Sequence, residues 1–211
     1  MRGRRLSIVP APERLIGMRS VSIGVAVHRA AFSTVGWMVL EIRPPEVGDA
    51  DELGRVHVRA WQAAYTGGLM PDEYLDSLSE TDRASMWRSS LENPPRAKAA
   101  RLVATVDDEV VGFALVGPAD SDPDAEIGEL YAINVDPAHW GTGAGAALID
   151  AAMAALQASG FASAVLWVHP DNQRARSFYA KRGWIDDGVD RQQEVLGVEV
   201  PETRLSLAFA S

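Results

Sequence analysis

The sequence of 211 residues contains no cysteine, which excludes a disulfide framework, a thiol nucleophile and a cysteine-ligated metal site. Histidine is also scarce. The only four are His28, His57, His139 and His169, and no two of them share metal-ligand spacing within one predicted element. We therefore expect no metal site. The apolar share of 47% and charged share of 23% are typical of a globular protein, and the length suits one domain.

Positive charge is in deficit as well. The formal net charge is −9, which argues against a nucleic-acid partner because phosphate binding needs a basic surface. A negative protein suits a cationic ligand such as an amine, a polyamine or a basic peptide. The alternative is that the acidity serves solubility alone.

The N-terminal part differs from the rest in charge. Residues 1–38 contain six Arg and one Glu, a local charge of +5, which leaves −14 for residues 39–211. An apolar stretch runs from Val21 to Leu40, but His28 and Arg29 lie inside it, at high cost in a bilayer. We interpret 1–38 as an N-terminal extension, either disordered or the product of a start assigned upstream of Met38. Residues 39–211 are predicted to form the domain, with no membrane segment and a cytoplasmic location.

Hydrophobic periodicity predicts a mixed α/β domain around one sheet. Strands are expected over 39–43, 101–106, 109–116, 126–135, 162–168, near Trp184 and over 204–208. Helices are expected over 49–65, from Pro71, and over 81–91, 141–159 and 171–181. Asp107-Asp108 is predicted to join two of the strands as a hairpin.

The most informative segment is LYAINVDPAHWGTGAGAAL, from Leu130 to Leu148. Gly141, Gly143 and Gly145 alternate where a helix is expected to begin, and glycine lets the backbone turn tightly and approach a ligand. The unpaired N–H groups of a first helical turn form an anion site. A diphosphate is the natural occupant, and no Lys follows as in the ATP- and GTP-binding loop.

Two other interpretations of this segment remain open. Gly141, Gly143 and Ala146 match the dinucleotide pattern G-x-G-x-x-A, although five residues, 136–140, separate the strand from the first glycine. The glycines could also serve only to begin an Ala-rich helix.

A second segment, VLWVHPDNQRARSFYAKRGW, spans Val165 to Trp184. Asn172, Ala175 and Tyr179 fall on one face of the predicted helix. Asn172 could hydrogen-bond a pantetheine amide or simply cap the helix. Tyr179 could reach a reacting sulfur or pack in the core with its hydroxyl at the rim.

Together the two segments resemble motifs A and B of the GNAT superfamily of N-acetyltransferases. The first is similar to L-x-x-I-x-V-x-P followed by [QR]-x-x-G-x-[GA], and the second to N-x-x-A-x-x-F-Y-x-x-x-G-F. The matching residues are Leu130, Ile133, Val135, Pro137, Gly143, Gly145, Asn172, Ala175, Phe178, Tyr179 and Gly183. The motifs cover about 55 residues. The [QR] position is Trp140 here, which removes one polar contact with the coenzyme.

The resemblance implies a mostly antiparallel mixed sheet of about seven strands, flanked by helices and splayed between the fourth and fifth strands. It also implies that acetyl-CoA is the co-substrate. Its pantetheine would pair with the backbone of Ile133, Asn134 and Val135 and contact Asn172. Its diphosphate would lie on the amides of Gly141, Thr142, Gly143, Ala144, Gly145 and Ala146.

The chemistry implied is transfer of an acetyl group to a primary amine of a small molecule or peptide. Tyr179 matches the tyrosine that protonates the departing thiolate. Glu129, six residues before Val135, corresponds to a glutamate base of members resembling histone acetyltransferases; a solvated strand residue is the alternative. The base of ribosomal-protein acetyltransferases is absent, because its position is Trp167.

The sequence contains no motif that identifies the residues that bind the acceptor. Trp61, Tyr65 and Tyr74 are candidates for acceptor binding, with helix packing as the alternative. We expect a monomer or homodimer. The competing function is a non-catalytic acyl-CoA-binding or sensing domain. The sequence does not identify the acceptor or exclude a longer acyl donor.

Overall fold

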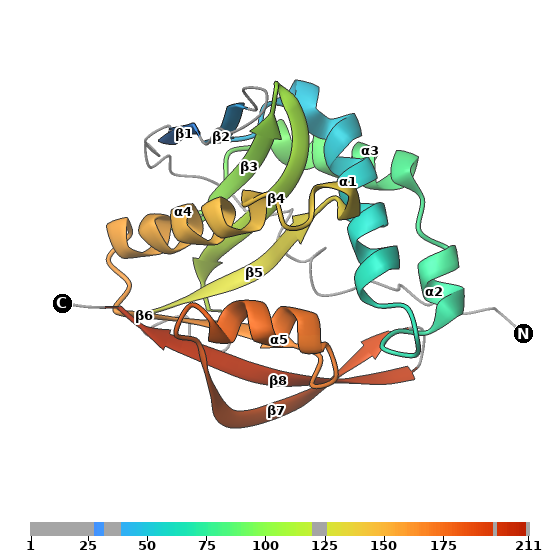
Figure 1. Cartoon of the computed structure of the whole chain (residues 1–211), viewed down its shortest axis with the longest axis vertical. Helices are drawn as coiled ribbons and strands as arrows, with labels where there is room; N and C mark the ends of the chain where they lie inside the picture. Colours follow the sequence, from blue (N-terminus) through green and yellow to red (C-terminus); the bar gives the residue numbers. More distant parts are fainter. Residues whose placement is uncertain (1–27, 32–38, 120–125, 196–197, 210–211) are drawn as a thin grey trace, which may run out of the picture.

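The structure of the protein is a computed structural model that describes residues 28–31, 39–119, 126–195 and 198–209. One eight-stranded sheet runs through it in the order β1-β2-β3-β4-β5-β6-β8-β7 (Figure 1). Only β5 and β6 pair in parallel; the other neighbours are antiparallel. The strands are β1 (His28–Ala31), β2 (Val39–Arg43), β3 (Ala100–Val106), β4 (Glu109–Pro118), β5 (Ile127–Val135), β6 (Ser163–Val168), β7 (Ile185–Val195) and β8 (Val198–Ala208).

The predicted mixed, mostly antiparallel sheet is confirmed, and seven of its strands lie in residues 39–211. The eighth strand, β1, comes from the predicted N-terminal extension and pairs with β2 at the sheet edge. Residues 1–27 and 32–38, the rest of that extension, lie outside the described residues, so its predicted disorder and the proposed start at Met38 stay predictions.

Helices cover both faces of the sheet. They are α1 (Ala50–Ala64), α2 (Asp72–Asp76), α3 (Glu80–Leu91), α4 (Ala144–Ala158) and α5 (Gln173–Ala180). The α4 and α5 side chains share one buried cluster with the sheet, and those of α1 and α3 share another. Within the described ranges, no helix combines the length and the apolar character needed to span a membrane.

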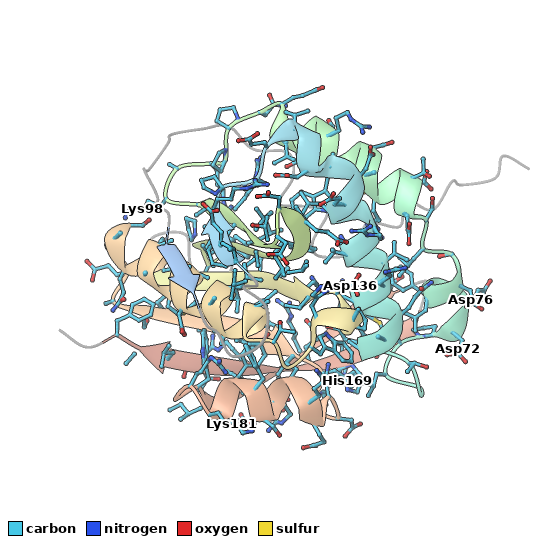
Figure 2. All side chains as sticks on the ribbon, turned by 45° about the horizontal axis from the view of Figure 1, so that its top comes forward. Asp72, Asp76, Lys98, Asp136, His169 and Lys181 are labelled. Atoms are coloured by element: carbon cyan, nitrogen blue, oxygen red, sulfur yellow. The ribbon has the colours of Figure 1, made fainter. Side chains whose placement is uncertain are left out.

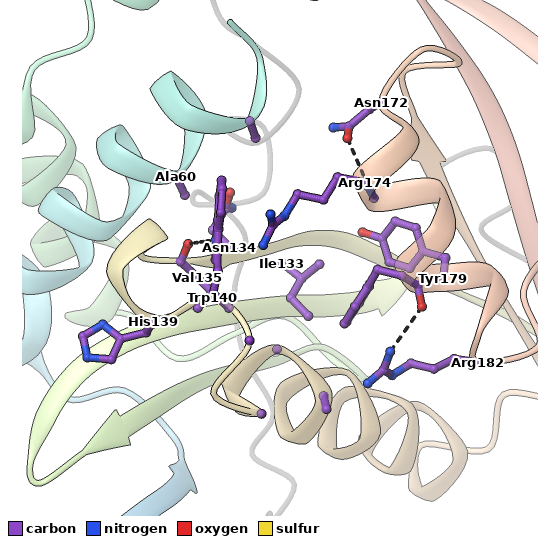
Figure 3. A pocket seen from close by; sticks show the side chains of 17 residues that line it. Ala60, Ile133, Asn134, Val135, His139, Trp140, Asn172, Arg174, Tyr179 and Arg182 are labelled. Carbon is purple, nitrogen blue, oxygen red and sulfur yellow. Dashed lines mark hydrogen bonds between the residues drawn. The ribbon is translucent and has the colours of Figure 1, made fainter. Parts of the chain in front are cut away.

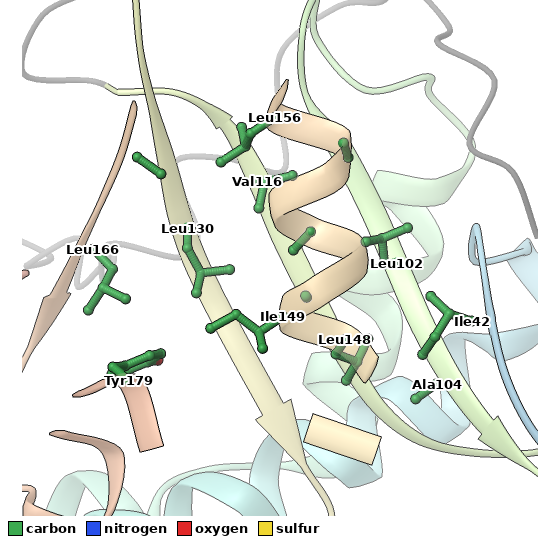
Figure 4. Close-up of a cluster of buried hydrophobic side chains, with 14 of the residues drawn as sticks. Ile42, Leu102, Ala104, Val116, Leu130, Leu148, Ile149, Leu156, Leu166 and Tyr179 are labelled. Atoms are coloured by element: carbon green, nitrogen blue, oxygen red, sulfur yellow. The ribbon is translucent and has the colours of Figure 1, made fainter. Parts of the chain in front are cut away.

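The packing of α4 fixes the place where this helix begins. Leu148, Ile149 and Leu156 are fully buried against β3, β4 and β5 (Figure 4). Each contributes about 1.5–3 kcal/mol by leaving water. The helix therefore presents its N-terminus at a fixed position beside the end of β5.

A split opens in the sheet between β5 and β6. The two strands pair only from Ile127–Glu129 to Ser163–Val165, although β5 continues to Val135 and β6 to Val168. The strands diverge beyond these three pairs, which is the splay expected between the fourth and fifth strands of 39–211.

A bulge in β5 lies just past the last paired residue. Leu115 is opposite Ala132 and Val116 is opposite Leu130, so Tyr131 is one residue extra on β5. Such a bulge bends a strand and breaks the alternation of its side chains. As a result, Leu130, Ile133 and Val135 all pack on the α4 side.

The bounds of one helix and two strands differ from the sequence predictions. The helix predicted from Gly141 begins at Ala144, because Gly141 and Gly143 have φ angles of +82° and +98°, which an α-helix cannot contain. The last two strands, β7 and β8, are longer than predicted. Their extra residues are mostly charged or polar and partly exposed, so they carry no hydrophobic alternation that would have marked them as strands.

Candidate active site

A pocket of about 380 Å³ connects the start of α4, the end of β5, the α5 face and the C-terminal part of α1 (Figure 3). Most of the predicted coenzyme-binding residues line it together with Tyr179. The lining residues are Ala60, Ala64, Ile133, Asn134, Val135, His139, Trp140, Gly141, Gly143, Gly145, Ala146, Asn172, Arg174, Ala175, Phe178, Tyr179 and Arg182. Thr142 and Ala144, which were also predicted, belong to the same turn without lining the pocket.

The glycine turn leaves the helix amides open to this pocket. The first helical hydrogen bond runs from the Ala147 amide to the Gly143 carbonyl, and Gly143, at the N-cap, has no side chain to cap the end. The amides of 144–146 thus fall outside the helical pattern. A Cβ at Gly141 or Gly143 would meet nothing within 4 Å. Exposed amides, the helix dipole and open space are what a diphosphate requires.

The edge of β5 that faces the split carries backbone groups for a second interaction. The Asp136 amide bonds to β4 through the Val111 carbonyl, and backbone groups alternate along an antiparallel strand. The backbone groups of Ile133 and Val135 therefore point into the split. The Trp140 indole N–H already donates to the Val135 carbonyl at 2.9 Å. Within the described ranges, the backbone groups of Ile133 and the Val135 amide have no hydrogen-bond partner, so this edge can pair with an extended ligand.

Asn172 caps α5, as one of the two interpretations predicted. Its Oδ1 accepts a hydrogen bond from the Ala175 amide at 3.1 Å. The side chain is 7% exposed and also lines the pocket. Because the cap uses only the oxygen, the amide nitrogen remains a donor on the pocket side. The capping and ligand-binding interpretations are thus compatible.

The Tyr179 hydroxyl lies in an environment that keeps it protonated. Tyr179 is 9% exposed and packs beside Phe178 and Trp184. Burial raises the pKa of its hydroxyl above the usual value, and nearby Tyr65 raises it further. A phenol with a raised pKa holds its proton at neutral pH and can donate it.

Arg174, on α5, and Arg182, two residues after the end of α5, line the pocket, and both were missed by the sequence analysis. The Arg174 guanidinium lies 3.6 Å from the centroid of the Trp140 ring. The Arg182 guanidinium lies 4.1 Å from the Phe178 ring and donates to the Phe178 carbonyl at 3.2 Å. Trp140 stands at the motif position where the family has a Gln or Arg. The positive charge that this change removes from the pocket is supplied by Arg174 and Arg182 instead. The sequence shows the change at the Trp140 position but not which residues compensate for it, because the contact joins two different elements.

Glu129 is the last β5 residue that pairs with β6, where the split begins. It is 9% exposed. Because Leu130 points toward α4, the Glu129 side chain is on the opposite face of the sheet, toward α1. It is not among the described residues that line the pocket. The role of Glu129 as a base stays a prediction.

The three aromatic residues predicted to bind the acceptor lie together. The Trp61 ring is 5.0 Å from Tyr65 and 5.8 Å from Tyr74, in a cluster with Met70, Leu75 and Val200. Trp61 and Tyr74 are buried by this packing, whereas Tyr65 is half-buried.

Tyr65 is the half-buried member of this cluster. Burial raises the pKa of its hydroxyl to about 12, with further contributions from the charge of Glu202 and from Tyr74. Tyr65 in turn contributes to the raised pKa of the Tyr179 hydroxyl.

Acidic side chains are also present on α2. Asp72, Glu73 and Asp76 are exposed, and Figure 2 shows Asp72 and Asp76 at the outer side of the helix. They form a solvated face. Asp136, in contrast, is buried at the end of β5, where it caps the following turn and pairs with Arg59 at 3.3 Å (Figure 2). This contact joins α1 to the loop before α4.

Comparison with known proteins connects this geometry with one family. The sequence profile of the acetyltransferase (GNAT) family matches residues 56–184. An uncharacterized N-acetyltransferase of Mycobacterium tuberculosis (strain ATCC 25618 / H37Rv) is 34% identical over 141 residues, which cover 67% of this chain and 86% of that protein. The mycothiol acetyltransferase of Kocuria rhizophila is 33% identical over 149 residues, covering 69% of this chain but only 46% of that longer protein.

A solved structure agrees in fold. The PaiA N-acetyltransferase of Thermoplasma acidophilum, in complex with coenzyme A, superimposes with a TM-score of 0.62 at 22% identity, covering 81% of this chain and 99% of that one. At this identity the likeness concerns the fold alone. The family profile spans more than half of the chain, and the mycobacterial relative is matched over most of its length. The chain therefore belongs to the acetyltransferase (GNAT) family.

Proposed function

We propose that this protein is an acetyl-CoA-dependent N-acetyltransferase that acts on a primary amine of a small molecule or peptide. The observation that carries the proposal is one continuous pocket, running from the open amides at the head of α4 to the Tyr179 hydroxyl. An anion site at one end and a protonated phenol at the other match the two ends of a coenzyme A thioester.

The residues present fit the coenzyme. The amides of 144–146 and the Arg174 guanidinium would hold its diphosphate, the backbone of Ile133 its pantetheine, and the Asn172 amide nitrogen a pantetheine carbonyl. Acetyl-CoA, when bound, supplies a thioester that an amine can attack. The chain's own tasks are to orient the two reactants and to move protons.

The reaction needs a base and an acid, and we assign one residue to each role. An ammonium group has a pKa of about 10.4 and no lone pair, so a base must remove a proton from it before the nitrogen can attack the thioester carbon. Glu129 takes that proton at its carboxylate, directly or through a water molecule. As the carbon–sulfur bond breaks, the Tyr179 hydroxyl donates its proton to the sulfur. The phenol is protonated at neutral pH and so has a proton to donate, and burial keeps it in this form by raising its pKa.

A non-catalytic acyl-CoA-binding domain is the second candidate. The observation that favours it is the position of Glu129, which does not line the pocket among the described residues. The two functions are separated by measuring thiol release from acetyl-CoA with a panel of polyamines, amino sugars, amino acids and basic peptides. Saturable coenzyme binding without turnover on any amine favours the binding domain, and amine-dependent thiol release favours the enzyme.

Glu129→Gln refines the test. If Glu129 is the base, this variant loses most of the turnover and the acidic limb of the pH–rate profile, while its affinity for coenzyme A is unchanged. A variant with the full rate and an unaltered profile assigns the base to another group. The expected cytoplasmic location and the monomeric or dimeric state stay predictions.

A further inference from the structure

Trp167 lies on the acceptor side of the split. It is two residues beyond Val165, the last β6 residue that pairs with β5. Leu166 and Val168 belong to the buried cluster under α4 and α5, so Trp167 projects from the opposite face of the sheet. That face also carries Glu129. The Trp167 ring is half-buried and stands where the two strands have separated.

Two arginines of the last hairpin stack on this ring. The guanidinium carbon of Arg191, on β7, lies 3.9 Å from the Trp167 ring centroid, and that of Arg204, on β8, lies 5.9 Å away. Arg204 is directly opposite Trp167 in the sheet. Both distances fall within the range of cation–π contacts with an aromatic ring.

Both guanidinium groups are also fixed through one edge. Arg191 Nε donates to Glu202 at 2.7 Å, and Arg204 Nε donates to Asp187 at 2.8 Å. Within the described ranges, the Nη amino groups of these two arginines make no hydrogen bond to the protein. The side chains of Arg191 and Arg204 are 37% and 27% exposed. Two oriented donor groups thus remain open to solvent beside an aromatic ring.

This cluster is next to the reaction site. Glu202, the partner of Arg191, is close enough to raise the pKa of the Tyr65 hydroxyl, and Tyr65 in turn affects Tyr179. Val200, on the same face of β8 as Glu202, packs in the cluster with Trp61 and Tyr74. A molecule on the Trp167 face therefore lies beside the split, on the side of the sheet that carries Glu129.

We propose that Trp167, Arg191 and Arg204 form the acceptor site, and that the acceptor is a primary amine that also carries a carboxylate. The carboxylate binds the Nη groups, and the amine points into the split. Planar guanidinium groups bind carboxylates through paired hydrogen bonds, and groups that are already oriented lose little entropy on binding. Because Glu202 and Asp187 balance the two arginines, the site favours a zwitterion over a simple anion. The proposal rests on the proposed acetyl transfer for the role of the amine.

The test uses matched pairs of amines that differ only in this carboxylate. L-leucine and L-leucinamide, 4-aminobutyrate and its amide, and glycylglycine and its amide are titrated calorimetrically into the full-length protein, with and without saturating coenzyme A. Within at least one pair, the carboxylate member is expected to bind about 10- to 100-fold more tightly, the range for hydrogen bonds to a charged group. The pairs also distinguish a free amino acid from a peptide C-terminus.

Variants assign any preference to the cluster. In Arg191→Gln and Arg204→Gln, the carboxylate and amide members of a pair should bind equally, without a change in amide binding or in the affinity for coenzyme A. Arg204→Lys should retain part of the preference for the carboxylate. Arg88→Gln is the matched control, because Arg88 on α3 also pairs with a carboxylate, Asp51, at 2.8 Å. This control should keep the full preference.

Three results overturn the proposal: no carboxylate-bearing amine binds, acid and amide bind equally in every pair, or the preference persists in the Arg191→Gln/Arg204→Gln double variant. Failure of the proposed function is separately visible. A protein that prefers the carboxylate members but neither binds coenzyme A nor releases its thiol keeps the site and refutes the transferase. A protein that acetylates only amines without a carboxylate keeps the transferase and refutes the proposed acceptor site.

Discussion

The two sides of the split are built in different ways. The coenzyme side is local in sequence: the β5 edge, the glycine turn and the start of α4 lie within 19 residues, 130–148, and α5 follows soon after. The proposed acceptor side is assembled from α1, β6 and the β7–β8 hairpin, which are more than 100 residues apart at the extremes. Anion binding through backbone amides tolerates little variation in local sequence, whereas side-chain recognition can be supplied from any neighbouring strand.

The comparison predicts the largest effect for a change in the glycine turn. Gly143→Asp should weaken coenzyme A binding about 1000-fold, because two like charges about 4 Å apart repel by about 4 kcal/mol near a protein surface. Calorimetric titration measures this affinity. Gly160→Asp is the matched control, since Gly160 ends the same helix with a φ of +86° and nothing within 4 Å of an added Cβ. Similar losses of affinity in both variants would remove the glycine turn from the coenzyme site.

The next effect concerns the phenol at the far end of the pocket. Tyr179→Phe should lower kcat by about 10- to 1000-fold, as expected when a general acid is lost, with coenzyme affinity nearly unchanged. Steady-state kinetics and calorimetry separate the two quantities. Tyr131→Phe, which loses a hydroxyl that donates to the Pro118 carbonyl, should keep the rate. A full rate in Tyr179→Phe means that another group protonates the sulfur.

On the acceptor side, His57 should make the free energy of unfolding depend on pH. His57 of α1 is packed between Trp61 and Phe113, and burial, aided by the charge of Arg83, lowers its pKa from 6.5 to about 3. The unfolded chain therefore binds a proton below pH 6.5 that the folded chain does not. The free energy of unfolding should fall by about 1.4 kcal/mol per pH unit between about pH 6 and 4 from this group alone.

Urea denaturation at pH 7.5 and pH 5 measures that fall. His57→Leu keeps an apolar side chain of similar size in the same place. In this variant, the free energy of unfolding should decrease less between pH 7.5 and pH 5 than in the wild-type protein, and the difference should equal the contribution of one proton. An equal decrease in both proteins would show that His57 does not titrate on unfolding.

The smallest effect is expected for the charge that α5 adds to the coenzyme side. Arg174→Gln should weaken coenzyme A binding about 3- to 10-fold, since one exposed, stacked guanidinium contributes about 1 kcal/mol. The loss should shrink at high salt. Arg176→Gln, which removes the neighbouring arginine paired with Asp186 at 3.3 Å, is the control. If the Arg174 variant binds coenzyme A as tightly as this control, Arg174 only packs on Trp140 and does not contact the coenzyme.

These differences explain how far the sequence could predict the structure. The hairpin at Asp107-Asp108 is correct, and both residues have the positive φ that this turn requires. The helix after the glycine turn and the capping residue Asn172 follow from local backbone chemistry. The bulge at Tyr131 leaves no mark in residue type, because it depends on the register with β4.

Contacts between distant segments were beyond sequence reasoning. The long β7–β8 hairpin is largely polar, so the stacking of Arg191 and Arg204 on Trp167 could not be anticipated from periodicity. Arg174 was missed because its partner, Trp140, lies on another element. The cationic acceptor suggested by the negative net charge stays a prediction.

The most direct test is a crystal structure of the protein with coenzyme A. The account predicts the diphosphate on the amides of 144–146, the pantetheine along the split edge of β5 beside Ile133, and the sulfur near the Tyr179 hydroxyl. A coenzyme bound on another surface, or a glycine turn that stays free while the coenzyme binds elsewhere, would contradict it.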